Sequence, residues 1–482
     1  MSTYPNRIRV LPTGWHSSPP SEAFELSDMD HTMPKVYVQI AEVFELPDDS
    51  YANKNQILSN MVKGLEFTLS QFPIMTGNLQ TDDKNGRMWV TRKQDSGVDL
   101  YINELQTLTY AGLRDRHFPA KALKGILPKV ITDRQLFSPF GLNADEGIFM
   151  STFQINFIAG GVILAAAIHH SCSDGPGCDG FLSTWAASSA AIARWLPLQP
   201  IDKTALDRSR LSAPSKPEPE KWNEIDAYLE KEYPVLYDAG GPPQMPPPNF
   251  TMPELSITMW HFPHSTTEKL KTEANASLPD RDECSFVSTY DVVMATAWKH
   301  ITKAKIPLLQ PPLDREVVLC HAVNTRNKLD PPLSHHYLGN AVAMPRTSPT
   351  TIQTLISSPI ALLAQKVRAS INSITPTYLR DLPLWIAGLP DRRHLSYRLN
   401  AFLGMDLAAT SWQSMRSYEA HDFGFGLPKA LRFPCPEFEG YVFVYPSRAK
   451  EEGTEVCICL EKGCMERLKA DEEFGRWAQV RE

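Results

Sequence analysis

An α/β protein with two similar domains is the fold class that this sequence predicts, and three observations lead to it. The chain has 482 residues, which is more than one compact hydrophobic core usually serves. Strand-like and helix-like segments alternate in both halves, in roughly the same order, which is compatible with a duplicated α/β unit. A proline-rich stretch over 197–253 separates the two halves.

The N-terminal half contains the clearest periodic segments. Residues 35–46 are rich in Val, Ile, Tyr and Phe and predict a strand, as do residues 86–92. Helical spacing predicts a helix over 53–72, which stops before Pro73. Two apolar runs over 150–170, broken at 159–161, predict a hairpin, and the Ala-rich stretch 177–196 predicts a helix.

Residues 197–253 predict a connection between domains. Proline at this density cannot sustain a helix or a central strand, and we expect only a short helix near 221–232. A long loop inside one compact domain is unusual, so a boundary is the better interpretation. We therefore expect an N-terminal domain over 1–200, a crossover linker over 201–253 and a C-terminal domain over 254–482.

The C-terminal half repeats the mixed pattern. We expect strands at 254–262 and 316–326, helices at 266–276 and 286–304, a hairpin within 440–463 and a closing helix from 464 to 479. The helix over 286–304 follows a Ser/Thr cap.

Composition and charge exclude several classes of protein. A formal net charge of −7 argues against a nucleic-acid binder, which would show a basic surface. The chain has 8 cysteines and no CxxC pair, so we expect buried free thiols rather than a metal site or a disulfide framework. The N-terminus lacks an apolar signal core, and the longest apolar run, 160–168, is too short to span a bilayer. We expect a soluble protein of the cytoplasm.

The stretch AIHHSCSDGPG, residues 167–177, combines His169, His170 and Asp174 with small residues. Gly175, Pro176 and Gly177 prevent a long helix through it, so it predicts a tight loop at a strand end, where catalytic residues often lie. Three interpretations remain open from this stretch alone: histidines that fill space, a metal site, or a catalytic base.

Further motifs, in order along the chain, decide among them. HHSCSDG resembles the HHxxxDG motif that BAHD acyl-CoA-dependent acyltransferases share with condensation domains of nonribosomal peptide synthesis. DFGFG, from Asp422 to Gly426, is similar to the DFGWG motif of BAHD enzymes, which condensation domains lack. LSQFPIMTGNL (69–79), the segment 322–342 and TSW (410–412) resemble three other family segments. The C-terminal half is most similar to fungal members, such as the trichothecene 3-O-acetyltransferase type.

The resemblance implies a fold, a catalytic base and a supporting ion pair. It implies two chloramphenicol-acetyltransferase-like domains with mixed sheets, joined by a long crossover loop, with an active-site channel between them. His170 would be the general base, acting directly within a ternary complex. Asp174 would pair with Arg326 and hold the loop rather than orient the imidazole, and Gly175 would permit a turn or a close approach. His169 is expected to be structural.

The resemblance also implies the remaining site residues. The DFGFG residues Asp422, Gly424, Phe425 and Gly426 would be mainly structural. Phe425 stands where the family has tryptophan and has no N–H to donate, so an oxyanion donor must be another group, such as a backbone N–H or Ser411. Lys271, Ser288 and Ser411 are the candidate cofactor-binding residues. Lys299, Lys429 and Arg432 are weaker candidates for contacts with CoA.

The sequence thus predicts an O-acyltransferase that uses acyl-CoA, with acetyl-CoA as the expected donor, and acylates a hydroxyl of a small secondary metabolite. No permanently bound cofactor, metal, nucleic acid or membrane span is expected, and the resemblance implies a monomer. The alternatives are a condensation-type enzyme using a carrier-protein thioester, N-acylation of an amine, a non-catalytic binding protein and a metal-dependent hydrolase.

Overall fold

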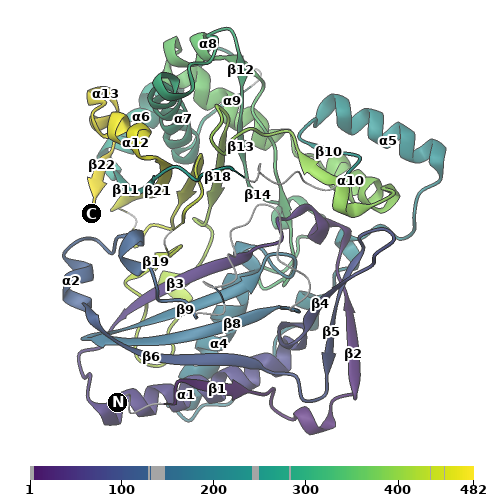
Figure 1. Cartoon of the computed structure of the whole chain (residues 1–482), viewed down its shortest axis with the longest axis vertical. Helices are drawn as coiled ribbons and strands as arrows, with labels where there is room; N and C mark the ends of the chain where they lie inside the picture. The colour runs from purple at the N-terminus through teal and green to yellow at the C-terminus, as the bar shows by residue number, and fades with distance from the viewer. Residues whose placement is uncertain are drawn as a thin grey trace.

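The architecture has two lobes, each built on a six-stranded mixed sheet (Figure 1). The computed structural model describes residues 5–128, 131, 147–241, 249–281, 284–434, 436–449 and 451–482. The first sheet has the order β1 (Arg7–Val10), β6 (Val98–Thr109), β8 (Ser151–Ala159), β9 (Gly161–His169), β3 (Tyr37–Glu45) and β19 (Ala430–Arg432). The second has the order β13 (Leu319–His321), β18 (Leu407–Ser411), β20 (Tyr441–Val444), β21 (Gly453–Glu461), β11 (Leu255–Pro263) and β22 (Gln479–Arg481).

The four central strands of the two sheets share one topology. In the first sheet β6 and β8 are parallel, and β8–β9 and β9–β3 are antiparallel. In the second, β18 and β20 are parallel, and β20–β21 and β21–β11 are antiparallel. Among these four strands, the one that comes first in the chain, β3 or β11, lies beside the one that comes last, β9 or β21. The predicted fold class, two similar α/β domains with mixed sheets, is confirmed.

Helices pack against one face of the first sheet, because each helix presents a row of apolar side chains to the apolar side chains of the sheet. In α1 (Tyr51–Gln71), Ile57, Met61, Leu65 and Leu69 are buried, and the helix is capped by Ser50 and ends before Pro73. It packs on α4 (Gly175–Ala193) at Gly64, where a Cβ would lie 2.2 Å from Ser189 Oγ. The β8–β9 hairpin turns at Gly160, whose φ of 72° favours glycine.

The second sheet is covered in the same way by α6 (His264–Ala276), α7 (Thr289–Leu309), α9 (Ile360–Asn372) and α12 (Lys462–Lys469). A capping box of Ser288 and Asp291 begins α7. The helix ends at Leu309, five residues beyond the predicted end at 304. Smaller elements complete the chain: β2 (Ser21–Glu25), β4 (Asn78–Thr81), β5 (Met88–Lys93), β7 (Ile148–Phe149), α2 (Tyr110–Arg114), β15 (Val342–Ala343), β16 (Thr350–Thr351), α8 (Ile352–Ser357) and α11 (Ser417–Ala420).

Two predicted elements are interrupted in the structure. The expected strand 316–326 is divided into β12 (Glu316–Val317), β13 and β14 (Val323–Asn324), which pair with three different partners. The expected closing helix is two helices, α12 and α13 (Glu472–Gly475). The break lies at Asp471, whose carboxylate accepts hydrogen bonds from the backbone N–H groups of Glu473 and Phe474 and so starts a new helix.

The predicted linker is a packed part of the fold. It contains α5 (Pro219–Glu232), which confirms the short helix expected near 221–232, and β10 (Leu236–Asp238), which pairs with β17 (Leu395–Tyr397). Helix α5 packs on α10 (Pro376–Gly388), with Trp222 Nε1 donating to Trp385 O at 2.8 Å. A buried apolar cluster joins these elements with residues of both lobes, such as Met29 and Cys320, so the crossover is part of a shared core.

The C-terminal half also contributes a strand to the first sheet. Residues 430–432, from the C-terminal half, form β19 and pair antiparallel with β3 of the first sheet. The domain limits 1–200, 201–253 and 254–482 stay a prediction. The pairing of β19 with β3 crosses them, as does the pairing of β10 with β17.

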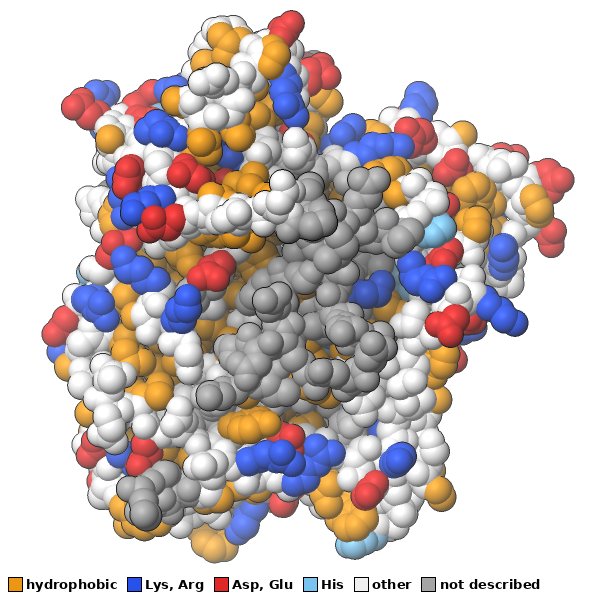
Figure 2. All heavy atoms as spheres, viewed as in Figure 1, with side chains coloured by type: hydrophobic (Ala, Val, Ile, Leu, Met, Phe, Trp, Pro, Cys, Tyr) orange, Lys and Arg blue, Asp and Glu red, His pale blue; other side chains and the backbone are white. Residues whose placement is uncertain are grey.

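Charge and burial agree with the composition. Figure 2 shows Lys and Arg side chains interspersed with Asp and Glu over the face that it draws. Seven cysteines are described and all are buried, as expected, and Cys435 lies outside the described residues. Within the described ranges, no helix is both long enough and apolar enough to cross a bilayer.

Candidate active site

The HHSCSDG segment forms a tight loop between the end of β9 and the start of α4. Strand β9 ends at His169, and the His170 N–H donates to Val36 O at 2.7 Å. Helix α4 begins at Gly175, because the Asp174 side chain caps it by accepting from Gly177 N at 2.9 Å. The predicted loop at a strand end is confirmed.

His170 is held in one tautomer by Asn340. Its Nδ1 lies 3.1 Å from Asn340 Oδ1. The amide nitrogen of Asn340 donates to Asp30 Oδ1 and to the His170 carbonyl oxygen, both at 2.8 Å, which fixes the amide with its oxygen toward the ring. Nδ1 therefore carries the hydrogen and Nε2 carries the lone pair.

The Nε2 side of His170 is available to a substrate. The residue is only partly buried, and within the described part of the chain no hydrogen bond to Nε2 is found. Burial lowers the pKa of His170 below its usual value, although Asp174, Asn340 and Asp30 act in the opposite direction. The imidazole is accordingly neutral near pH 7 and can accept a proton.

His169, in contrast, is not available to a substrate. Its side chain is fully buried, its ring lies edge-on to Tyr37 at 5.1 Å, and burial lowers its pKa to about 3. Its Nδ1 accepts from Ser171 N at 3.3 Å. These contacts fit the structural role expected for His169.

Asp174 is engaged in the predicted ion pair with Arg326 rather than with His170. Arg326 Nη2 and Nη1 lie 2.7 and 2.9 Å from the two carboxylate oxygens, and both residues are almost fully buried. Asp174 also accepts from Gly177 N and Ala341 N, while Arg326 donates to two backbone carbonyls of the 337–339 segment. The pair ties the HHSCSDG loop to the C-terminal lobe.

Gly175 permits a close approach between the lobes. A Cβ at this position would lie 3.2 Å from Nε1 of Trp412, the last residue of the TSW motif. Trp412 is buried against Phe433, Phe443 and Tyr445. Ser411, the candidate oxyanion donor, is its neighbour at the end of β18 and is partly exposed.

DFGFG is a turn that docks on the N-terminal lobe. The Asp422 carboxylate accepts from Gly424 N at 2.8 Å and Gly426 N at 3.0 Å, and pairs with Arg194 at 2.6 Å. Gly424 and Gly426 have φ values of 98° and 120°, which favour glycine. Phe425 packs on Phe44 with ring centroids 5.2 Å apart. The contacts are those of a structural element, in line with the expectation.

The residue before this motif, His421, is a buried cation between the lobes. Nδ1 lies 2.5 Å from Glu42 on β3, and Nε2 lies 3.2 Å from Asp179 on α4. Burial alone would lower its pKa, but the two carboxylates outweigh burial and raise the pKa to about 10. Its position in the sequence gave no sign of this role.

We expect the protein to lose stability in alkali as His421 loses its proton. Because the folded-state pKa exceeds the ordinary value of 6.5, its contribution is complete below that pH and is lost as the pH rises toward about 10. Over this window, unfolding free energy should fall by up to about 1.4 kcal/mol per pH unit more in the unchanged protein than in His421→Gln. Denaturant titrations at several pH values measure the difference. Parallel curves for the two proteins would contradict a charged His421.

The candidate CoA contacts differ in availability. Lys271 on α6 is partly exposed and pairs with Glu268 at 2.6 Å. Ser288 is the cap of α7, and its hydroxyl accepts from Arg368 Nη2 at 2.7 Å, which places a guanidinium beside it. Lys271 and Ser288 are close, since Asn275 bonds to both Lys271 O and Val287 O.

The weaker candidates are mostly occupied. Arg432 is fully buried and pairs with Glu455 at 3.0 Å, and Lys299 is buried and donates to Ser358 O at 2.9 Å. Neither can reach a phosphate in solution, so these two suggestions are not supported. Lys429 is exposed.

Two other features lie apart from His170. Two cavities of about 310 and 390 Å³ flank the crossover segment, and His170 lines neither. His300, Asp471 and Glu473 are close enough to share an ion, but Lys303 and Lys299 already pair with Glu473. Two ammonium groups at this cluster oppose a cation.

The comparisons with known proteins cover nearly the whole chain. The sequence pattern of the Transferase family matches residues 14–475. The chain belongs to the Transferase family. The resemblance of its motifs to the BAHD acyltransferases is thereby confirmed, and the protein is an enzyme that transfers a chemical group.

The relatives of this Transferase-family chain include fungal acetyltransferases. Acetyltransferase FGR3 of Gibberella zeae is 26% identical over 489 residues, covering 98% of this chain and 93% of the relative. Trichothecene 3-O-acetyltransferase TRI101 of Fusarium sporotrichioides is 27% identical, with 96% and 98% covered. The crystal structure of F. graminearum TRI101 with coenzyme A and T-2 mycotoxin matches with a TM-score of 0.77 at 19% identity, covering 96% of this chain and all of that one.

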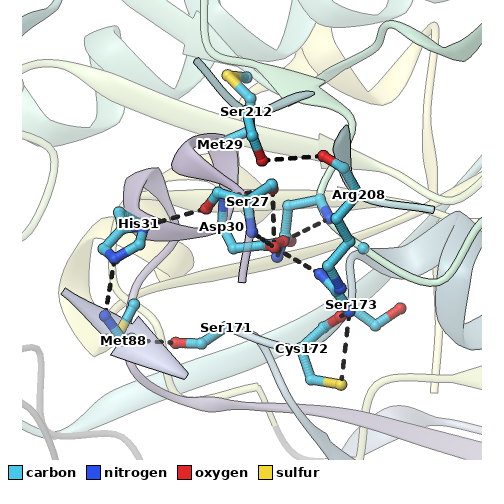
Figure 3. Close-up of polar contacts among 12 residues, drawn as sticks. Ser27, Met29, Asp30, His31, Met88, Ser171, Cys172, Ser173, Arg208 and Ser212 are labelled. Carbon is cyan, nitrogen blue, oxygen red and sulfur yellow. Dashed lines mark hydrogen bonds and ion pairs between the residues drawn. The ribbon is translucent and has the colours of Figure 1, made fainter. Parts of the chain in front are cut away.

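Asn340 lies within the family-like segment 322–342, but no role for it was predicted from the sequence. The signal available was its position in a motif, directly after Gly339. Asp30 and Arg208, which Figure 3 shows meeting beside the HHSCSDG loop, carry no local sequence signal.

Proposed function

We propose that this Transferase-family protein is an acyl-CoA-dependent O-acyltransferase with His170 as general base. The observation that carries the proposal is the neutral His170, with Nδ1–H held by Asn340 and Nε2 open. An alcohol is a poor nucleophile while protonated, and a base of this kind contributes about 10²–10⁴ in rate.

The steps balance without another cofactor. The acceptor hydroxyl gives its proton to Nε2 of His170 as its oxygen attacks the thioester carbonyl carbon. The tetrahedral adduct then collapses, the carbon–sulfur bond breaks, and CoA leaves as the thiolate. The proton on Nε2 passes to that sulfur, which returns His170 to its neutral form. The oxyanion donor remains open, with Ser411 and backbone N–H groups as candidates.

The proposed donor is acetyl-CoA and the proposed acceptor is a hydroxyl of a fungal-type secondary metabolite. Support comes from relatives along the full length whose names specify acetyl transfer, FGR3 and TRI101, and from the CoA and T-2 mycotoxin bound in the TRI101 structure. We further propose a monomer of the cytoplasm. Light scattering during size-exclusion chromatography and cell fractionation test these last two points.

A screen of donors against acceptors tests the function. Acetyl-CoA and longer acyl-CoA thioesters are incubated with panels of alcohols and amines, and product masses are recorded. Ester products formed with free acyl-CoA support the proposal. Products formed only from carrier-protein thioesters would favour a condensation-type enzyme, and amide products alone would favour N-acylation. Turnover that a strong chelator abolishes would favour the metal-dependent alternative.

We propose Lys271 as a contact of the CoA phosphates, as the family resemblance implies. Lys271→Ala should raise KM for acyl-CoA about tenfold, because one charge-assisted hydrogen bond is lost, and should leave kcat nearly unchanged. Lys269→Ala, on the same helix and more exposed, is the matched control and should change neither constant. A drop in kcat with KM unchanged would refute the phosphate contact.

A further inference from the structure

A buried carboxylate, Asp30, is linked to the active-site histidine through Asn340 and has no role in the chemistry above. It belongs to a short 3-10 turn, Asp28–Thr32, and its side chain is fully buried. One carboxylate oxygen accepts from the N–H and the hydroxyl of Ser27, at 2.7 and 2.8 Å. The other accepts from Asn340 N and Asn340 Nδ2, both at 2.8 Å.

Arg208 neutralises this carboxylate from the crossover segment. Its Nη1 lies 2.5 Å from Asp30 Oδ2, and its Nη2 donates to Cys172 O at 2.8 Å, within the HHSCSDG loop. Figure 3 shows Arg208 inserted between the turn that carries Asp30 and the loop that carries Cys172. The crossover thus supplies a side chain that contacts two catalytic-site elements of the N-terminal lobe.

Asp30 fixes the orientation of the Asn340 side-chain amide. Two N–H groups of Asn340, one backbone and one side chain, converge on a single oxygen of Asp30. Without that negative charge, the amide could turn and present its NH₂ group to Nδ1 of His170. Nδ1 would then have to accept, and the hydrogen would move to Nε2, which removes the lone pair that the reaction needs.

We propose that Asp30, held by Arg208, is a positioning residue of the acyl transfer: through Asn340 it keeps His170 in the Nδ1–H form, with Nε2 as the base. Neither Asp30 nor Arg208 contacts the reacting atoms in this scheme. The inference rests on the proposed function, because it assigns a purpose to the tautomer only if His170 is the base.

The charges around His170 fix the sign of a pH test. On its own loop it faces Asp174, which Arg326 pairs, and the neutral His169. Asp30, on the Asp28–Thr32 turn, also raises the pKa of His170, and Asp30 is itself paired with Arg208. Removal of the Asp30 charge therefore takes away one of the groups that favour the protonated imidazole, so His170 should lose its proton at lower pH.

The experiment compares Asp30→Asn with the unchanged enzyme, measuring kcat, KM and the pH profile of kcat/KM. We expect kcat to fall about 10²-fold, below the about 10⁴-fold loss that a wrong histidine tautomer causes in a serine protease. KM for acyl-CoA should stay within about twofold, as no uniform binding contact is lost. The acidic limb of the profile should move to lower pH. A merely structural role would instead lower the active fraction and leave kcat per folded molecule unchanged.

Two further variants keep the outcome decisive. Lys305→Met removes one partner of an equally buried ion pair, with Glu439, in the C-terminal lobe, and should lower stability without moving the limb. If Asp30→Asn does not fold, Asp30→Asn combined with Arg208→Gln leaves neither charge buried alone and should show the same fall in kcat, with a smaller shift of the limb because the opposing charge of Arg208 is removed as well. Unchanged kcat with His170→Ala inactive would overturn the inference alone; an active His170→Ala would overturn the proposed function.

Discussion

His170→Ala should lower kcat by about 10²–10⁴ and leave KM for acyl-CoA nearly unchanged, because the ring accepts a proton in the reaction and is not needed to hold the donor. The ring is partly exposed, so the substitution leaves little cavity and should lower Tm only slightly. Steady-state kinetics with product detection, on protein whose folded fraction is checked by thermal unfolding, measures the effect.

The neighbouring histidine provides the matched control. His169→Gln also removes an imidazole from the loop, but His169 is fully buried and packs on Tyr37, away from any role in proton transfer. It should lower stability more than His170→Ala and turnover per folded molecule far less. The unchanged enzyme should show an acidic limb of kcat/KM below about pH 6.5, since burial lowers the pKa of His170. Equal turnover in His170→Ala and the unchanged enzyme would refute the assignment of the base.

The sequence predicted the parts of this site that lie in continuous motifs. His170, Asp174 and Gly175 occupy a loop whose flanking strand and helix have clear hydrophobic patterns. The partner Arg326 came from the family resemblance, and the pair is present at 2.7 Å. The DFGFG motif predicted a structural element at Asp422. Its physical basis, two glycine N–H groups that donate to one carboxylate, could not be predicted from the motif.

What the sequence could not predict depends on contacts between distant segments. Asp30 and Arg208 are 178 positions apart, and Glu42 and His421 are 379 apart. Such pairs leave no spacing signal, because only the packing of the two lobes and the crossover brings them together. The same reason explains β19: residues 430–432 are too few to show a strand pattern, and pairing with β3 alone makes them one.

Arg326→Met should lower the free energy of unfolding by about 3–5 kcal/mol, the largest stability effect that we expect in the chain. The substitution leaves the Asp174 carboxylate buried with only two backbone N–H donors, Gly177 and Ala341. It also leaves the carbonyls of Tyr337 and Gly339 without the guanidinium. The midpoint of the first transition in urea and the Tm measure the loss, and a shift equivalent to less than about 1 kcal/mol would contradict the role of the pair.

A double-mutant cycle separates the ion pair from its two members. Asp174→Asn combined with Arg326→Met leaves no single charge buried, so the double variant should be more stable than the sum of the two single losses predicts, by about 0.5–3 kcal/mol. Strict additivity would mean that the residues act independently. Because His170 is bonded to Asn340 and not to Asp174, turnover per folded molecule of Asp174→Asn should fall far less than that of His170→Ala. A fall as deep as that of His170→Ala would instead place Asp174 in the proton transfer.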